Sequence, residues 1–352
     1  MLSRLLCCTL LSLALLTPSP ATAQDRPFKV CWSVYAGWML WGDLAEQGII
    51  DKWAKQYGIE IQVQEVPDYV GSIEQYSAGQ FDACAMTNMD ALTIPAAAGV
   101  DSTALIIGDF SAGADGILVR GSNKDLQDLK GKTVLLVENS VSHYLLSRAL
   151  EWARLQPGDV TIENVSDADL AEAWRSGRGD AVVTWNPILS DLQQDGDSVL
   201  VFSSRHIPGE ILDLLVINSQ TLTQHPELGR ALTGAWFEGM RLMGLPNAAG
   251  RAARARMASA AQTTAEDFDN QLRTIRSFYS ARAAVTFYQN GKLADTMERV
   301  ARFADSQKLL GTEHGMRALG IAFGDDQVLG NASRIMLRFN PTYMRLAADK
   351  QL

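Results

Sequence analysis

Short apolar runs alternate with amphipathic helical patterns along most of this chain, and this alternation limits the possible folds more than any other feature. Residues 28–110 contain four apolar runs, FKVCWSV, IEIQVQEV, FDACAM and STALIIGDF, with helical patterns between them. Parallel strands need a crossover of helical length. The order therefore predicts right-handed βαβ units and a parallel sheet with helices on both faces.

A second set of the same kind follows over residues 115–204. Its apolar runs are DGILVRG, KTVLLVEN, VTIENV, DAVVTW and SVLVFSS. The run ILDLLVINS then supplies one more strand, after which the pattern is helical almost to the C-terminus. No low-complexity linker separates the two sets, so we expect the chain to cross between two lobes on strands, outward at DGILVRG and back at ILDLLVINS.

The predicted fold class is therefore α/β, with two lobes, hinge crossover strands and a helical C-terminal region. The predicted domains are lobe 1 over residues 24–114, lobe 2 over residues 115–212, and a return to lobe 1 with the C-terminal helices over residues 213–352. Ligands of open α/β sheets bind beyond the carboxyl ends of the strands. The gap between the lobes is thus the expected place for a ligand.

The first 23 residues have the pattern of a secretory signal peptide, with Arg4, an apolar run and an Ala-Thr-Ala ending. This predicts cleavage near Gln24 and an exported protein. The formal net charge of the whole chain is −9. Such a balance argues against nucleic acid or an anionic membrane as partner and is compatible with a cationic or neutral ligand.

Two cysteines, Cys31 and Cys84, follow the predicted cleavage site, both in predicted strands. They are either two buried thiols or a disulfide, and the sequence leaves both open. We find no nucleophile elbow, HExxH, P-loop or GxGxxG after a strand, and the four histidines lack metal-ligand spacing. The sequence predicts no catalytic residue, no metal and no cofactor.

The stretch CWSVYAGWMLW, residues 31–41, is the first candidate binding segment. Its periodicity assigns Trp32 to a strand and Trp41 to a helix, both as packing residues. Tyr35 and Trp38 fall in the turn between that strand and that helix, where Gly37 permits a tight backbone. They either pack or contact ligand, because such a turn faces the gap between the lobes.

Carboxylates follow two other strands. Asp90 belongs to TNMD, where it either favours the helix N-terminus or faces the gap as a ligand carboxylate. Asp109 ends one strand and Asp115 begins the next, at the proposed outward crossing. At least one of the two is expected at the gap, and the alternative for each is a turn acid.

The remaining candidates come from the second lobe and the return crossing. Ser140 has the position of a helix N-cap, with His143 in the first turn and Glu138 at the end of the preceding strand. Trp185 ends a strand before Asn-Pro and either packs or lines the gap. Asp213 precedes the apolar residues of the return strand, which places it at the hinge.

Several motifs together resemble the periplasmic substrate-binding proteins of nitrate/taurine-type ABC importers. They are SAGQFDACAM followed by TNMD, DLKGKTVLL followed by SHYLLSRAL, and GDAVVTWNP. Within that group, CWSVYAGW, TNMDALTIPAA, IIGDFS and the tail LRFNPTYMRLAADKQL resemble the branch associated with urea carboxylase, which is linked to urea and guanidine. The resemblance implies a type II periplasmic binding fold that closes on its ligand by a hinge motion.

The resemblance also implies ligand contacts at Tyr35, Trp38, Asp90, Ser140, His143, Trp185 and Asp213. Asp109, Asp115 and Glu138 are added from position and charge. The resemblance further implies a periplasmic, monomeric protein that has no cofactor. Such a protein delivers its ligand to an ABC permease and ATPase in the inner membrane.

The candidate positions gather carboxylates and aromatic rings, whereas an anion site needs arginine, lysine or unopposed N–H groups. Guanidinium is planar and charged and fits carboxylates and aromatic faces. We therefore expect guanidine as the ligand, with urea second. The alternatives are a binder of a sulfonate, nitrate or pyrimidine-type ligand, or a secreted amidinohydrolase or precursor-synthase-like enzyme on the same fold.

Overall fold

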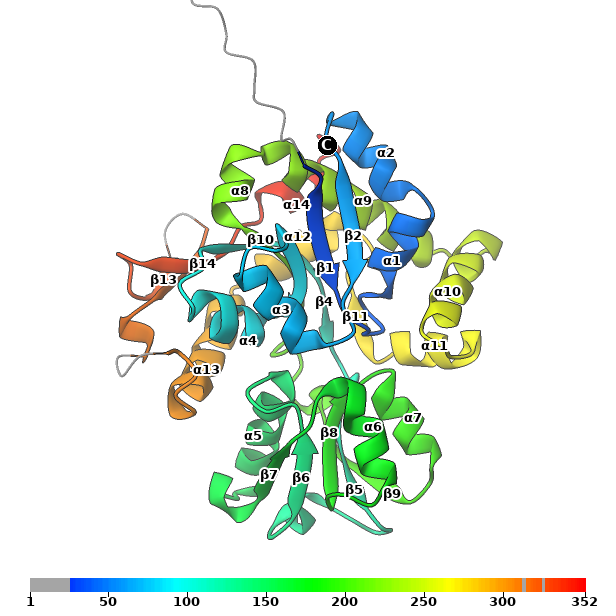
Figure 1. Cartoon of the computed structure of the whole chain (residues 1–352), viewed down its shortest axis with the longest axis vertical. Helices are drawn as coiled ribbons and strands as arrows, with labels where there is room; N and C mark the ends of the chain where they lie inside the picture. Colours follow the sequence, from blue (N-terminus) through cyan, green and yellow to red (C-terminus); the bar gives the residue numbers. More distant parts are fainter. Residues whose placement is uncertain (1–25, 312–314, 325–326) are drawn as a thin grey trace, which may run out of the picture.

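The computed structural model describes residues 26–311, 315–324 and 327–352. The chain forms two lobes, each built on one β-sheet and covered by helices, with strands crossing between them (Figure 1). This confirms the predicted two-lobed α/β fold with crossover strands. The predicted signal peptide, residues 1–23, lies outside the described residues. Within those residues, none of the helices combines the length and apolarity needed to cross a membrane.

The large lobe contains a nine-stranded mixed sheet. Its main path has the order β13-β12-β14-β4-β10-β3-β1-β2, and β11 pairs with β4. The strands are β1 (Phe28–Trp32), β2 (Ile61–Glu65), β3 (Ala83–Thr87), β4 (Ser102–Ser111), β10 (Leu212–Asn218), β11 (Ile275–Ser277), β12 (Gly320–Phe323), β13 (Gln327–Gly330) and β14 (Ile335–Phe339). The predicted parallel arrangement holds for β2, β1 and β3, whereas β10 runs antiparallel to both β3 and β4 because it returns from the other lobe.

The small lobe contains a five-stranded sheet of order β7-β6-β8-β5-β9. Its strands are β5 (Asp115–Arg120), β6 (Thr133–Leu136), β7 (Thr161–Asn164), β8 (Ala181–Trp185) and β9 (Ser198–Ser203). Helices α5 (Val141–Ala153), α6 (Asp167–Arg175) and α7 (Ile188–Gln194) cover it. The chain enters this lobe from β4 to β5 and leaves it from β9 to β10, at the two crossings that the sequence predicts.

The large lobe carries the other helices. They are α1 (Met39–Glu46), α2 (Ile49–Gln56), α3 (Tyr69–Ser77), α4 (Asn88–Ala91), α8 (Ser219–Gln224), α9 (Pro226–Met243), α10 (Ala248–Ala260), α11 (Ala265–Leu272), α12 (Ala281–Tyr288), α13 (Leu293–Ser306) and α14 (Thr342–Ala348). Helices α1 and α2 are separate, because Gly48 between them has a φ of 68°. In α1, Trp41 is a packing residue that stacks on Trp236 of α9 at 4.9 Å between ring centroids.

The C-terminal region contains strands as well as helices. Residues 265–280 have a helical pattern, yet their second half forms β11, which pairs antiparallel with β4. Further on, β14 pairs parallel with β4 and extends the large sheet, with β12 and β13 beyond it. The last part of the chain thus belongs to the large lobe and flanks β4, one of the two strands that lead to the small lobe.

Cys31 and Cys84 form a disulfide between β1 and β3, with their Cα atoms 4.5 Å apart. The two cysteines are register partners on adjacent strands and are fully buried. Their 53-residue separation encloses α1, α2, β2 and α3. The crosslink therefore ties β1 to the neighbouring strand β3, which leads to Asp90.

Replacing Cys31 and Cys84 together by alanine is expected to lower the free energy of unfolding by about 3 kcal/mol, since the disulfide restricts the unfolded chain over this loop. Urea or heat denaturation of oxidised wild type and the double variant measures the difference. A thiol reductant should destabilise only the wild type, with no effect on the variant as the control. A wild type whose midpoint does not move on full reduction would contradict the expectation.

Candidate ligand-binding site

An enclosed cavity lies between the two lobes, and we call it the interlobe cavity. Its lining residues are Tyr35, Trp38, Tyr69, Thr87, Asp115, Val141, Trp185, Ile211 and Asp213. The volume that the centre of a water-sized sphere can occupy inside it is about 20 Å³. One water molecule needs roughly 10–15 Å³ on this measure. In this closed arrangement the cavity therefore suits a ligand of only a few non-hydrogen atoms.

Four aromatic rings form a continuous wall of the cavity. Their centroids follow one another at 5.1 Å for Tyr35 and Trp38, 5.5 Å for Trp38 and Tyr69, and 5.5 Å for Tyr69 and Trp185. The first two rings come from the turn after β1, the third begins α3, and the last ends β8 of the small lobe. Gly37 makes this turn possible, because a Cβ there would lie 2.7 Å from the Tyr35 ring.

Two carboxyl groups, Asp109 and Asp213, face each other behind this wall. They are register partners on the antiparallel strands β4 and β10, and their side chains hydrogen-bond one another. Burial raises the pKa of Asp109 to about 6, and burial together with the Asp109 charge raises the pKa of Asp213 well above its usual range. The Tyr35 hydroxyl faces the same pair, and burial and these charges raise its pKa as well.

Asp115 and Asp90 complete the acidic set. Asp115 is the register partner of Trp185, so the two stand side by side at the edge of the small sheet. Burial raises its pKa to about 7, and a hydrogen bond from Ser111 opposes this rise. Asp90 lies behind Tyr69 and Thr87, whose hydroxyls donate to it at 2.5 and 2.8 Å. Burial raises the Asp90 pKa to about 6 despite these bonds.

The electrostatic character of the site follows from what lines it. All four carboxyl groups are buried, with Asp90 and Asp109 at most 1% exposed, and neither Lys nor Arg is among the described residues that line the cavity. Among the described residues, one oxygen each of Asp90, Asp109 and Asp213, and the indole nitrogen of Trp38, have no hydrogen-bond partner. A buried polar group without a partner is costly. Of these atoms, the Asp213 oxygen and the Trp38 nitrogen belong to lining residues. A small ligand that carries N–H donors and positive charge would satisfy the Asp213 oxygen.

The structure does not bring every candidate residue to the cavity. Ser140 caps α5 and bonds the Val137 carbonyl, and His143 packs edge-on against Phe303 of α13. Burial lowers the His143 pKa, so this ring is not a cation at neutral pH. Glu138 is exposed on the small lobe. None of these three side chains lines the interlobe cavity. Asp90 and Asp109 are not lining residues either, since they lie behind Tyr69 and Thr87 and beside Asp213.

Tyr69 is a lining residue that the sequence analysis missed. It begins α3, directly after β2, and its hydroxyl bridges Asp90 and the Thr87 amide. The position of Tyr69 after a strand end is the same signal that identifies Tyr35 and Trp185. Thr87 is the N-cap of α4, and it also lines the cavity.

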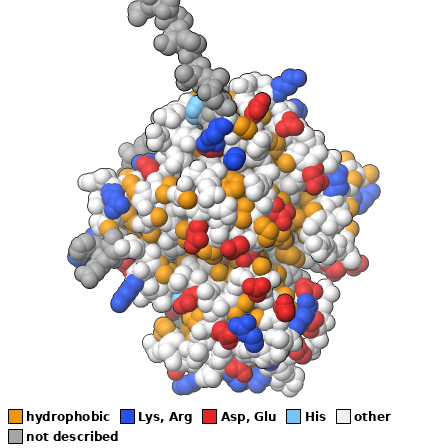
Figure 2. Space-filling model, in the orientation of Figure 1, with side chains coloured by type: hydrophobic (Ala, Val, Ile, Leu, Met, Phe, Trp, Pro, Cys, Tyr) orange, Lys and Arg blue, Asp and Glu red, His pale blue; other side chains and the backbone are white. Residues whose placement is uncertain are grey.

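Contacts across the cavity hold the lobes together. The Ala36 N–H donates to the Asn186 carbonyl at 3.3 Å, and the Asn186 side chain donates to Thr274 at 3.1 Å. The backbone N–H of Val141, the first residue of α5, lies near the Asp90 carboxyl and favours its ionised form, which lowers its pKa. On the face drawn in Figure 2, acidic side chains gather near the junction of the lobes. The chain is thus in a closed arrangement, with Asp90 touching both lobes.

Within the part of the chain that the structure describes, no group of three or more His, Cys, Asp or Glu side chains is arranged to hold a metal ion.

A two-sheet α/β fold with crossing strands and a closed cavity between its lobes defines the class of periplasmic binding protein folds. The chain belongs to the NMT1/THI5-like family, whose sequence model matches residues 46–248, more than half of the chain.

Similar proteins include the taurine-binding periplasmic protein of Escherichia coli (strain K12), 27% identical over 142 residues. That match covers 40% of this chain and 44% of the relative, so the chain spans less than half the length of this relative.

Among solved structures, the alkanesulfonate-binding protein SsuA from Xanthomonas axonopodis pv. citri, bound to MOPS, has a TM-score of 0.66 at 18% identity, covering 82% of this chain and 96% of that chain. The desulfurization enzyme DSZB has a TM-score of 0.54 at 16% identity, covering 81% and 94%. At these identities the structural likeness establishes the fold alone.

Proposed function

We propose that this protein is the extracytoplasmic solute-binding component of an ABC importer and that it captures guanidinium. One observation carries the proposal: two buried carboxyl groups, Asp115 and Asp213, line the cavity together with four aromatic rings, and the cavity suits a ligand of a few atoms. Two more buried carboxyl groups, Asp90 and Asp109, lie behind these lining residues. The periplasmic relative and the binding-protein fold support the general role. The chemistry of the cavity supports the ligand.

The acidic lining argues against the ligands that name the similar proteins. Taurine and alkanesulfonates each carry a sulfonate anion, and an anion among Asp109, Asp115 and Asp213 would meet like charge with no basic side chain lining the cavity. Burying an unpaired anion in such a place costs several kcal/mol. For a cation the electrostatic interaction with these groups is favourable instead. Burial disfavours ionised carboxylates, and a bound cation stabilises them.

Guanidinium fits the cavity better than urea, although both are small and planar. Its N–H groups match carboxylate oxygens in pairs, and its face stacks on aromatic rings. A cation over an aromatic face gains roughly 0.5–2 kcal/mol. Urea offers fewer N–H donors and no charge, so it would leave the carboxyl groups either protonated or unpaired.

The signal-peptide pattern over residues 1–23 and the periplasmic relative support export. In this role the protein works in the periplasm as a monomer and delivers its ligand to a permease and ATPase in the inner membrane. Closing of the two lobes around the ligand would create the surface that the permease recognises.

Isothermal titration calorimetry with guanidinium, methylguanidine, urea, taurine and nitrate tests the ligand. We expect guanidinium to bind at least roughly 100-fold more tightly than urea, because charged hydrogen bonds to buried carboxylates are lost with the neutral ligand. Taurine and nitrate should give no heat of binding. Tight binding of taurine or nitrate without binding of guanidinium would overturn the proposal.

An enzyme is the second candidate, since DSZB shares the fold and Asp109 and Asp213 are paired carboxyl groups of unequal pKa, as acid and base catalysts are. Incubating the protein with guanidinium and assaying urea and ammonia separates the two roles. Release of either product at more than one equivalent per protein would establish catalysis, whereas a binder leaves the ligand intact.

A further inference from the structure

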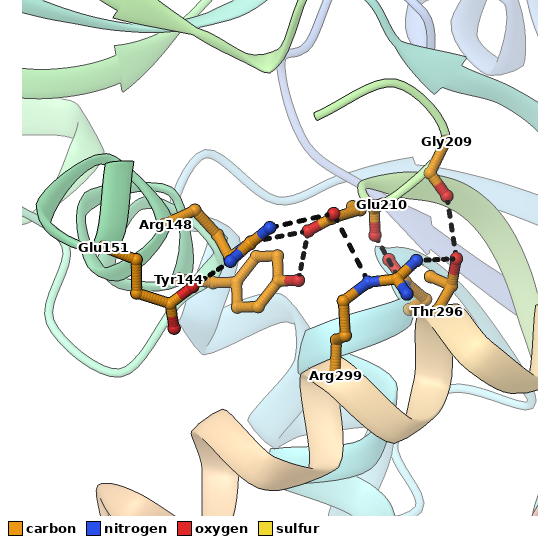
Figure 3. Close-up of polar contacts among 8 residues, drawn as sticks. Tyr144, Arg148, Glu151, Gly209, Glu210, Thr296 and Arg299 are labelled. Carbon is orange, nitrogen blue, oxygen red and sulfur yellow. Dashed lines mark hydrogen bonds and ion pairs between the residues drawn. The ribbon is translucent and has the colours of Figure 1, made fainter. Parts of the chain in front are cut away.

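A buried charge cluster lies outside the interlobe cavity, where α5 of the small lobe meets the return crossing and α13 of the large lobe (Figure 3). Its centre is Glu210, which is 8% exposed and stands between β9 and β10. Three side chains converge on its carboxylate: Tyr144 and Arg148 from α5, and Arg299 from α13. None of the four lines the cavity.

The bonds within this cluster are short and charged. Arg148 donates to both Glu210 oxygens, at 2.8 and 3.2 Å, and the Tyr144 hydroxyl donates at 2.6 Å. Arg299 forms an ion pair with the same carboxylate at 3.3 Å. Arg148 also contacts Glu151 one turn further along α5. Bidentate arginine–carboxylate pairs of this kind are among the stronger side-chain interactions.

The backbone around Glu210 is fixed to the large lobe. The Asn88 side chain donates to the Glu210 carbonyl at 3.1 Å and accepts from the Leu212 N–H at 2.9 Å. The Thr296 hydroxyl of α13 donates to the Gly209 carbonyl at 3.3 Å. Glu210 therefore moves with the large lobe, and its bonds to Tyr144 and Arg148 join the large lobe to the small one.

The same stripe of α5 reaches the cavity. Val141, Tyr144 and Arg148 are spaced three and four residues apart, so they share one face of the helix. Val141 lines the cavity together with Tyr69 and Thr87 of the large lobe, and Tyr144 and Arg148 bond Glu210 one to two turns further on. This face of α5 thus meets the large lobe at the cavity and at Glu210.

We propose that Tyr144, Arg148 and Glu210 form a latch that stabilises the closed arrangement and thereby sets the affinity for ligand without touching it. The apparent affinity of a ligand is reduced by the fraction of protein in the competent arrangement. The latch contributes to that fraction whichever small ligand the cavity holds. The inference rests on the proposed function in one respect, namely that capture requires the lobes to close.

The substitution Arg148→Gln tests the latch. It removes the charged bonds across the junction and is expected to weaken guanidinium binding by roughly 10- to 100-fold in calorimetry. Tyr144→Phe, which deletes a single hydroxyl, should weaken binding by roughly 2- to 10-fold and is the milder variant should Arg148→Gln fold poorly.

Arg254→Gln is the matched control. Arg254 pairs with Asp269 at 2.6 Å within the large lobe, and its side chain is 17% exposed against 19% for Arg148. Because Arg254 joins α10 to α11 and not the two lobes, its replacement should leave the affinity within about twofold of wild type, as expected for distant independent sites.

Hydrogen exchange in the ligand-free protein provides a readout that does not depend on the ligand. The Ala36 amide bonds across the lobes, and the Val141 amide lies near Asp90 of the large lobe. They should exchange faster in Arg148→Gln than in wild type or Arg254→Gln, whereas amides inside each sheet should not change. Should wild type fail to bind guanidinium, the proposed function falls and exchange still decides the latch. Equal affinity and equal exchange in Arg148→Gln and Arg254→Gln would overturn the latch.

Discussion

Replacing Asp213 by asparagine is expected to weaken guanidinium binding by roughly 10²- to 10³-fold, the largest effect of any single substitution in the cavity. Asp213 stands at the centre of the site, in register with Thr87 on one side and Asp109 on the other. Its substitution leaves the shape of the cavity and removes a negative charge from beside the cation. Calorimetry with guanidinium measures the loss.

The matched control for this substitution is Asp43→Asn. Asp43 is also a buried carboxylate, but it pairs with Arg256 at 2.6 and 2.9 Å, on the face of α1 that packs against α10, outside the cavity. Its replacement leaves Arg256 without its partner, so it should lower stability and leave the affinity unchanged.

The two variants should move stability in opposite directions. Asp213→Asn removes a carboxyl whose ionised form is disfavoured by burial and by Asp109, so the free protein should be equally or more stable. An Asp213→Asn protein that binds guanidinium within about threefold of wild type would show that Asp213 is not a ligand contact.

The fold was predictable from the sequence because the hydrophobic periodicity of each strand and helix can be read from a short stretch of residues. The alternation of strand and helix predicts both lobes, and strands without a linker predict the crossings at β5 and β10. The C-terminal strands were not predictable in the same way. The residues of β11 lie in a helical pattern, but they form a strand because they pair with β4. This pairing joins distant parts of the chain, so the local pattern does not reveal it.

The site was partly predictable, because strand ends of an α/β sheet face the ligand. This rule places Tyr35, Trp38, Asp115, Trp185 and Asp213 at the cavity wall. It equally covers Tyr69, which follows β2 and which the sequence analysis passed over because no strand-end motif stands out there. The roles of these residues in binding stay predictions.

Helix rotation explains why the candidates at the start of α5 do not line the cavity. The sequence shows that α5 begins near Ser140, and the rotation of the helix about its axis depends on contacts in the other lobe. In the structure His143 meets Phe303 of α13, and Val141 lines the cavity. The cavity therefore receives an apolar residue from α5 instead of the imidazole.

The acidic cavity stores unfavourable interactions in the free protein. Burial raises the pKa of all four carboxyl groups, because their ionised forms are less stable inside the protein than in water. Such sites trade stability for function. A cation that enters the cavity relieves this penalty, so the binding free energy should depend on how many protons the carboxyl groups have to release.

The affinity for guanidinium is expected to fall by roughly 10³-fold between pH 8 and pH 5, because protons compete with the cation for groups that titrate in this range. The pKa of Asp115 is raised to about 7 and those of Asp90 and Asp109 to about 6, while guanidinium keeps its charge throughout. Two groups titrating near 7 and near 6 account for the expected factor. The pKa of Asp213 is raised further. When guanidinium binds, the Asp213 proton must therefore also be released or be shared with Asp109.

The stability of the free protein should depend on pH in the opposite direction to the affinity, so it should rise as the pH falls. A carboxyl whose folded pKa is raised binds its proton more tightly in the folded chain, so its contribution is fully present below the unfolded pKa of about 3.9. That contribution is lost as the pH rises through 6 to 7, the range given by Asp90, Asp109 and Asp115. The difference in melting temperature between wild type and Asp115→Asn, measured without ligand at each pH, isolates the contribution of Asp115, whose pKa is about 7.

Calorimetry from pH 5 to pH 8, in buffers of different ionisation enthalpy, measures both the affinity and the number of protons released on binding. We expect at least one proton to be released per guanidinium near pH 6, with urea as the neutral control that releases none. Because a neutral ligand gains nothing from ionised carboxylates, urea affinity should stay level or rise toward low pH. Guanidinium affinity that is independent of pH would mean that the cation does not contact these carboxyl groups, and the cationic site would then have to be abandoned in favour of a neutral ligand.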